Sequence, residues 1–125
     1  MGKLRIIIAD DQPDMLEALT FMLQRDFEVV CAVEDGRSLV EAACSQHPNV
    51  IVSDIRMPGL TGPEAMKELC ARGEKIFFVL ISADQDFPAP PTWSFVAKTD
   101  LFSELVPAIH AAASGQVYHS GRGRL

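Results

Sequence analysis

The stretch Val50-Ile51-Val52-Ser53-Asp54-Ile55-Arg56-Met57-Pro58-Gly59-Leu60-Thr61-Gly62 decides how the rest of the chain is interpreted. It begins with an apolar, β-branched run that is too short for a helix, which predicts a buried strand. Asp54 follows where this strand should end, and a Pro-Gly turn comes after it. In an open α/β sheet, reactive groups gather beyond the carboxyl ends of the strands. We therefore expect Asp54 to face solvent and ligand at such an end.

Size and charge set limits on the class of protein. The chain has 125 residues, of which 48% are hydrophobic, and its formal net charge is -6. These values fit one globular domain with a core of its own. They argue against direct nucleic-acid binding by this domain, which needs clustered lysine and arginine. No apolar run reaches the ~20 residues that span a bilayer, and the start resembles no signal peptide. We therefore expect no membrane partner and a cytoplasmic location.

Apolar runs alternate with amphipathic segments along the chain. The runs that we predict as strands are residues 4–9, 27–33, 50–54, 76–81 and 93–97. Helix start signals lie at Pro13, Asp35-Gly36, Thr61-Gly62-Pro63 and Ser103. Strands that alternate with helices indicate an α/β fold with a parallel sheet covered by helices on both faces.

The last helix and the end of the chain give two further expectations. Ser103 is the expected N-cap of the last helix, because Pro107 then lies in the first turn, where proline costs least. Residues 116–125 are polar and contain glycine and arginine. We expect them to form a frayed tail.

Polar side chains follow four of the predicted strands. They are Asp10 and Asp11 after the first, Asp54 after the third, Ser82 after the fourth and Lys98 after the fifth. In a parallel sheet these strand ends share one edge, so the side chains should converge on one pocket. Three carboxylates so close repel one another by several kcal/mol at an intermediate dielectric, and a cation must offset this. Mg²⁺ is the usual cation for such an all-oxygen site, and Lys98 supplies a second positive charge.

This group of side chains is equipped to receive a phosphoryl group. Phosphoryl transfer needs in-line positioning and neutralisation of the equatorial oxygens. We expect Asp54 to attack as the nucleophile and to form an aspartyl-phosphate. Mg²⁺ and Lys98 would screen the transferred oxygens, and Ser82 would donate a hydrogen bond to one of them.

Together these residues resemble the receiver domain of bacterial two-component response regulators. The matching parts are Asp10-Asp11, the Asp54 strand with its Met57-Pro58-Gly59 loop, Ser82-Ala83 and Lys98. The resemblance covers residues 1–120, which leaves 121–125 as a polar tail or the start of an interdomain linker. It implies a flavodoxin-like (CheY-like) doubly wound sheet of five parallel strands in the order 2-1-3-4-5.

The resemblance also implies roles for individual residues. Asp54 would accept phosphate from a sensor histidine kinase, with self-phosphorylation and self-dephosphorylation but no turnover of a substrate. The implied Mg²⁺ ligands are Asp11, Asp54 and the backbone carbonyl of Arg56, with Asp10 helping through water. The implied switch has Ser82 moving toward the phosphate while Phe95 turns inward, although Phe95 fits a plain core position equally well. A homodimer is also compatible with the family.

The end of the chain resembles one branch of this family. Residues 114–120, with the sequence SGQVYHS, are similar to the end of receivers joined to a LuxR-type helix-turn-helix domain. Either the sequence stops at that domain boundary or the protein is a stand-alone receiver. The resemblance favours the first reading and transcription regulation as the output.

Residues 83–92 depart from the family pattern. A parallel crossover usually takes a dozen or more residues and contains a helix, but this segment is shorter and carries three prolines. We expect the fourth helix of the family to be missing or reduced to a turn. The altered segment is either a neutral truncation or a sign of altered output.

Two other functions are compatible with parts of the pattern. A receiver fold could serve as an interaction module that works without phosphate, for which the altered crossover is the support. A hydrolase of the haloacid-dehalogenase type also uses an aspartate after a strand. That class needs a second acid two residues later, and Arg56 occupies this position.

Overall fold

A five-stranded sheet forms the centre of the molecule. The computed structural model describes residues 2–121. All neighbouring strands are parallel, and their order is β2-β1-β3-β4-β5, as predicted. The strands are β1 (Arg5–Ala9), β2 (Glu28–Val33), β3 (Val50–Asp54), β4 (Phe77–Ser82) and β5 (Ser94–Ala97). All of the predicted strand bounds agree with these within one residue.

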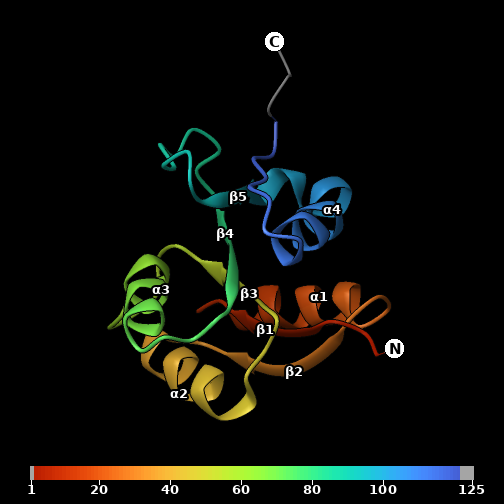
Figure 1. Ribbon diagram of the computed structural model, residues 1–125. Coiled ribbons are helices and arrows are strands. Elements are labelled where there is room, and N and C mark those ends of the chain that lie inside the picture. The colour runs from red at the N-terminus through yellow and green to blue at the C-terminus, as the bar shows by residue number, and fades with distance from the viewer. Residues whose placement is uncertain (1, 122–125) are drawn as a thin grey trace.

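Helices cover both faces of this sheet (Figure 1). They are α1 (Pro13–Leu23), α2 (Gly36–Gln46), α3 (Gly62–Ala71), the short 3-10 helix η1 (Lys98–Asp100) and α4 (Leu101–Ala113). Helices α1 and α4 pack on one face around Ile8 and Val52, and α2 and α3 pack on the other around Ile7 and Ile51. Within residues 2–121, no helix has the length and apolar character that a membrane span requires.

Local sequence signals explain most of these elements. The central strands β1 and β3 carry fully buried aliphatic side chains, which is typical of parallel strands with both faces covered. Glu28 is exposed at the start of the edge strand β2. Asp35 caps α2 by accepting a hydrogen bond from the Ser38 N–H at 2.8 Å. Thr61 and Glu64 form a capping box at the start of α3.

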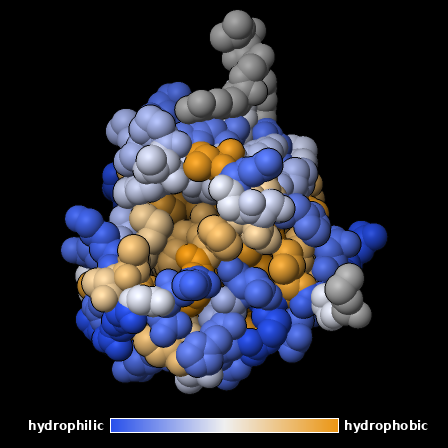
Figure 2. Space-filling view, viewed as in Figure 1, coloured by the Kyte–Doolittle hydropathy of each residue, from blue (hydrophilic) through white to orange (hydrophobic). Residues whose placement is uncertain are grey.

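The connection between β4 and β5 contains no helix, which confirms the prediction for residues 83–92. It forms turns and irregular loops (Figure 1). In place of a helix, Phe87 stacks on Phe95 with ring centroids 5.8 Å apart, and Trp93 stacks on Phe87. Figure 2 shows an apolar hollow on this side of the molecule. It corresponds to a cavity of about 310 Å³ whose lining includes Phe78 and Leu80.

The start of the last helix differs from the prediction. Helix α4 begins at Leu101 with Asp100 as its N-cap, so Ser103 is not the cap and Pro107 lies inside the helix. Burial of Leu101 and Leu105 explains the difference. The buried stripe of α4 begins at Leu101, two residues before Ser103, and its burial outweighs the cost of an interior proline.

The end of the described chain also differs from the prediction. Residues 116–121 are not frayed, because they fold back along β5. The Phe95 N–H donates to the Tyr118 carbonyl at 2.7 Å, and the Ser120 N–H donates to the Phe95 carbonyl at 2.9 Å. The remainder of the predicted tail, residues 122–125, lies outside the described residues.

Candidate functional site

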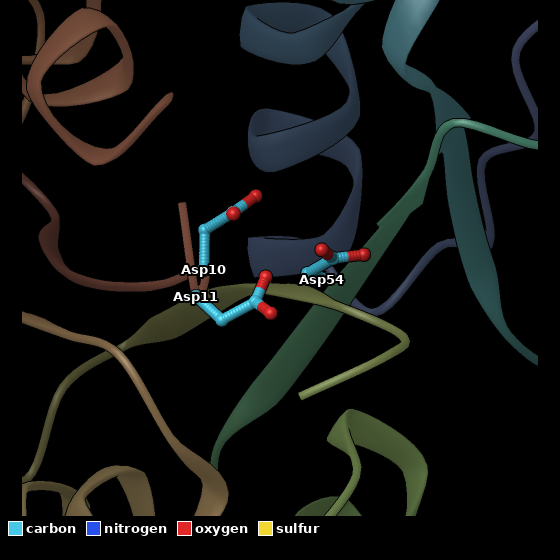
Figure 3. Close-up of side chains that lie close together, drawn as sticks. All are labelled: Asp10, Asp11 and Asp54. Carbon is cyan, nitrogen blue, oxygen red and sulfur yellow. The ribbon is translucent and has the colours of Figure 1, made fainter. Parts of the chain in front are cut away.

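Three carboxylates meet at the carboxyl ends of β1 and β3 (Figure 3). Asp10, Asp11 and Asp54 each offer an oxygen, and these oxygens all lie within 4.8 Å of one another. Asp10 is fully buried and Asp11 is exposed. Asp54 is 8% exposed, so solvent reaches only a small part of this residue. The pairing of β1 with β3 brings these residues together, as predicted from their positions after parallel strands.

Lys98 reaches this acidic group from the end of β5. Its Nζ atom lies 3.0 Å from Asp10 Oδ2 and 3.2 Å from Asp54 Oδ2. The lysine side chain is 13% exposed, so both ion pairs are largely shielded from water. The structure therefore places the predicted ammonium group beside the central aspartate.

The ionisation of the site follows from its burial. Burial raises the pKa of Asp54, and the neighbouring Asp10 carboxylate acts in the same direction, while Lys98 lowers it in part. Burial alone would lower the pKa of Lys98, but its contacts with Asp10 and Asp54 outweigh this and raise it. Lys98 is therefore charged at neutral pH, and the ionised form of Asp54 costs the folded state energy.

The acidic group fits a hard divalent cation. The site has three carboxylates, and one ammonium group pairs with two of them, so the site carries excess negative charge. Asp10 Oδ2 is buried and accepts no hydrogen bond from the described residues, although Lys98 pairs with it. The Arg56 backbone N–H lies close enough to the Asp54 carboxylate to lower the pKa of Asp54 in part, so the backbone of residue 56 borders the site. Carboxylate and carbonyl oxygens are the ligands that Mg²⁺ takes in proteins.

The two predicted switch residues lie next to the site rather than inside it. Ser82 ends β4, and its hydroxyl accepts a hydrogen bond from the Asp84 N–H at 3.0 Å. Among residues 2–121, no hydrogen bond joins Ser82 to Asp54. Phe95 is 5% exposed and packs against Phe87, so it already occupies a core position.

Two parts of the site's surroundings were missed by reasoning from sequence. A Cβ atom on Gly62 would collide with the Asp54 carbonyl oxygen, so only glycine lets α3 begin this close to β3. The signal available was a glycine directly after the helix cap Thr61. The other missed part is the contact of Tyr118 and Ser120 with β5, for which the local sequence contains no signal.

Comparisons with known proteins agree with this geometry. The family model described as "Response regulator receiver domain" matches residues 6–92. The transcriptional regulatory protein LiaR of Bacillus subtilis is 31% identical over 121 residues, which are 90% of this chain and 57% of LiaR. The transcriptional regulatory protein YxjL of the same species is 30% identical over 122 residues, which are 91% of this chain and 56% of YxjL. The chain thus spans little more than half the length of these relatives.

Solved structures show the same fold. The signal receiver domain of the putative response regulator NarL from Mycobacterium tuberculosis superimposes with a TM-score of 0.85 at 27% identity, covering 93% of this chain and 100% of that domain. A DNA-binding response regulator of the LuxR family from Staphylococcus aureus gives 0.79 at 26% identity, covering 88% and 98%. With its strand order, its acidic group and its lysine, the chain belongs to the receiver domain family of response regulators, the modules of phosphorylation-controlled signalling.

Proposed function

We propose that Asp54 accepts a phosphoryl group from a sensor histidine kinase in a Mg²⁺-dependent reaction and that the phosphorylated form changes output or partner binding. The observation that supports this most directly is the contact of Lys98 with Asp54 beside two further carboxylates. We also propose a cytoplasmic location, because membership of the receiver family and a kinase partner of this kind are compatible with it.

The residues of the site divide the chemistry between them. A carboxylate oxygen of Asp54 attacks the phosphorus of the phosphohistidine, the P–N bond breaks, and the imidazole leaves with the bonding electrons and takes up a proton. Lys98, now paired with Asp54, neutralises charge on the transferred oxygens. Ser82 ends the neighbouring strand β4 and donates its hydroxyl proton to one of these oxygens after its side chain turns.

The ion would be held by Asp11, Asp54 and the backbone carbonyl of Arg56, with Asp10 acting through water. Bound there, Mg²⁺ supplies charge neutralisation for the phosphoryl oxygens. The chain's own contribution is to hold Asp10 and Asp54 close together in spite of their repulsion, which the Lys98 ammonium group does.

A mass measurement tests the proposal. Incubation with Mg²⁺ and acetyl phosphate should add the mass of one phosphoryl group per chain, and Asp54→Asn should abolish the addition. Asp26→Asn is the matched control, because Asp26 is an exposed aspartate outside the site. If the wild type and Asp54→Asn gain mass alike, the proposal fails. Because the product remains on Asp54, we propose a switch and not a turnover enzyme.

The relatives suggest the output. LiaR and YxjL are transcriptional regulatory proteins that extend beyond the region matched here. We propose that the phosphorylated domain regulates transcription through a further domain of the intact protein, with a homodimer as a candidate active state. The crossover without a helix supports one alternative, an interaction module that ignores phosphate. An oligomeric state and partner affinity that are unchanged by phosphorylation would favour that alternative.

A further inference from the structure

The segment Tyr118–Gly121, here called the strap, is bound to the outer edge of β5. Phe95 both donates to and accepts from the strap, with distances of 2.7 Å to Tyr118 and 2.9 Å to Ser120. The Ala97 N–H donates to Ser120 Oγ at 2.9 Å, and the Tyr118 N–H donates to Ser94 Oγ at 3.1 Å. The strap therefore contacts three of the four residues of β5.

The strap is also tied to α4. The Tyr118 hydroxyl donates to Glu104 Oε1 at 2.9 Å, and the Gly121 N–H lies 3.3 Å from the same oxygen. Glu104 belongs to α4, which follows directly after Lys98 and η1. Any change in the position of β5 relative to α4 must therefore distort bonds of the strap.

The first link from the strap to the phosphoacceptor site runs through two consecutive residues, Ala97 and Lys98. Ala97, which holds Ser120, is followed by Lys98, which lies between Asp10 and Asp54. A phosphoryl group on Asp54 would place new negative oxygens beside Lys98. These would compete with Asp10 for the ammonium group and pull on the end of β5.

The second link passes through the crossover without a helix. The Ser82 hydroxyl accepts from the Asp84 N–H, and the Phe87 N–H donates to the Asp84 carbonyl at 3.1 Å. Phe87 in turn stacks on Phe95, whose backbone holds the strap. If Ser82 turns to donate to a phosphoryl oxygen, the turn that positions Phe87 loses a contact, and the packing on Phe95 changes.

We infer that phosphorylation of Asp54 loosens the strap from β5, so that the strap reports the state of the site to whatever follows it. This inference rests on the proposed phosphorylation of Asp54. Both links act on Phe95 and Ala97, and hydrogen bonds weaken steeply when they lose alignment. The structure shows the strap bound along β5, and the inference adds a released arrangement, because coupling of two sites requires an element with two states.

Amide hydrogen exchange measured by NMR tests the loosening. Beryllofluoride with Mg²⁺ serves as a stable mimic of the phosphoryl group on the wild-type chain. The amides of Phe95 and Ser120 should exchange about fivefold faster or more when the mimic is bound, while the core amide of Ile8 keeps its protection. Unchanged or slower exchange at Phe95 and Ser120 with the site loaded would overturn the inference.

Coupling between two sites is reciprocal, which gives a second test. Ser120→Ala removes the acceptor of the Ala97 N–H and should tighten beryllofluoride binding by a factor of about five or more. Tyr118→Phe, which removes the bond to Glu104, should act in the same direction. Ser45→Ala is the matched control, because Ser45 is an exposed serine on α2.

Equal affinity in Ser120→Ala, Tyr118→Phe and the wild type would also overturn the inference. Failure of the proposed function has a different signature. In that case neither beryllofluoride nor acetyl phosphate would load the wild-type chain, and Asp54→Asn would behave like the wild type.

Discussion

Replacing Lys98 with methionine removes the ammonium group from the acidic site and keeps an apolar stem of similar length. At the observed 3.0 and 3.2 Å, each ion pair has a gross attraction of about 5 kcal/mol at an effective dielectric of about 20. Desolvation of the ammonium group offsets several kcal/mol of this sum, and breaking such a buried pair typically costs about 3–5 kcal/mol. Because Asp54 retains some exposure, we expect the lower end, a loss of about 3 kcal/mol.

Urea unfolding at pH 7 measures this loss. The wild type and Lys98→Met are compared in EDTA and again in Mg²⁺. Mg²⁺ should stabilise the variant more than the wild type, because an ion bound by the carboxylates replaces the missing charge. Lys67→Met is the matched control, because Lys67 is exposed on α3, and its effect should stay within about 0.5 kcal/mol.

The pH dependence of the free energy of unfolding gives a further check, because its direction can be predicted. Without the ammonium group, the pKa of Asp54 should rise further above its usual range, so lowering the pH from 7 should stabilise Lys98→Met more than the wild type. A loss below about 0.5 kcal/mol in EDTA would refute the reasoning. It would mean that desolvation cancels the attraction and that Lys98 does not hold the acids together.

Three further predictions concern the fold and the site. Pro107→Ala should raise the free energy of unfolding by about 1–3 kcal/mol in urea, because the new N–H can bond the Ser103 carbonyl inside α4; a decrease would contradict this. Gly62→Ala should lower that free energy by about 1–3 kcal/mol and slow labelling by acetyl phosphate, because its Cβ collides with the Asp54 carbonyl; an unchanged melting temperature in calorimetry would contradict it. The pKa of Asp54 in the metal-free protein, followed by NMR of its side-chain carboxyl carbon, should lie above 3.8, because burial raises the pKa of this carboxyl. Without metal, the stability contribution of the same group should be greatest below pH 3.8 and should be lost as the pH rises through its folded pKa. A metal-free pKa of Asp54 at or below 3.8 would be inconsistent with burial as the cause.

The sheet and the acidic group were predictable because they depend on local signals and one topological rule. Val50–Asp54 is recognisable as a buried strand from its β-branched residues alone. Once the strands are parallel, their carboxyl ends must share an edge, which brings Lys98 to Asp54 across a separation of 44 residues.

Two of the misses, at the start of α4 and at the end of the described chain, arose where distant contacts outweigh local preference. Pro107 favours the first turn of a helix, but burial of Leu101 extends α4 toward η1. The polar composition of residues 116–121 predicts fraying, yet Tyr118 and Ser120 find partners on β5 more than 20 residues earlier in the chain. Local conformational propensities contain no information about partners so far away in the chain.

The pairing of the strap with β5 fixes the direction in which the chain leaves the domain. A helix that simply ended at Ala113 would let a following polypeptide swing freely about its last turn. Here the exit point at Gly121 is oriented by β5 through Phe95 and by α4 through Glu104. A fluorophore or fusion partner joined directly at Gly121 would therefore have a defined orientation, and small rotations of β5 would produce larger displacements of the attached group.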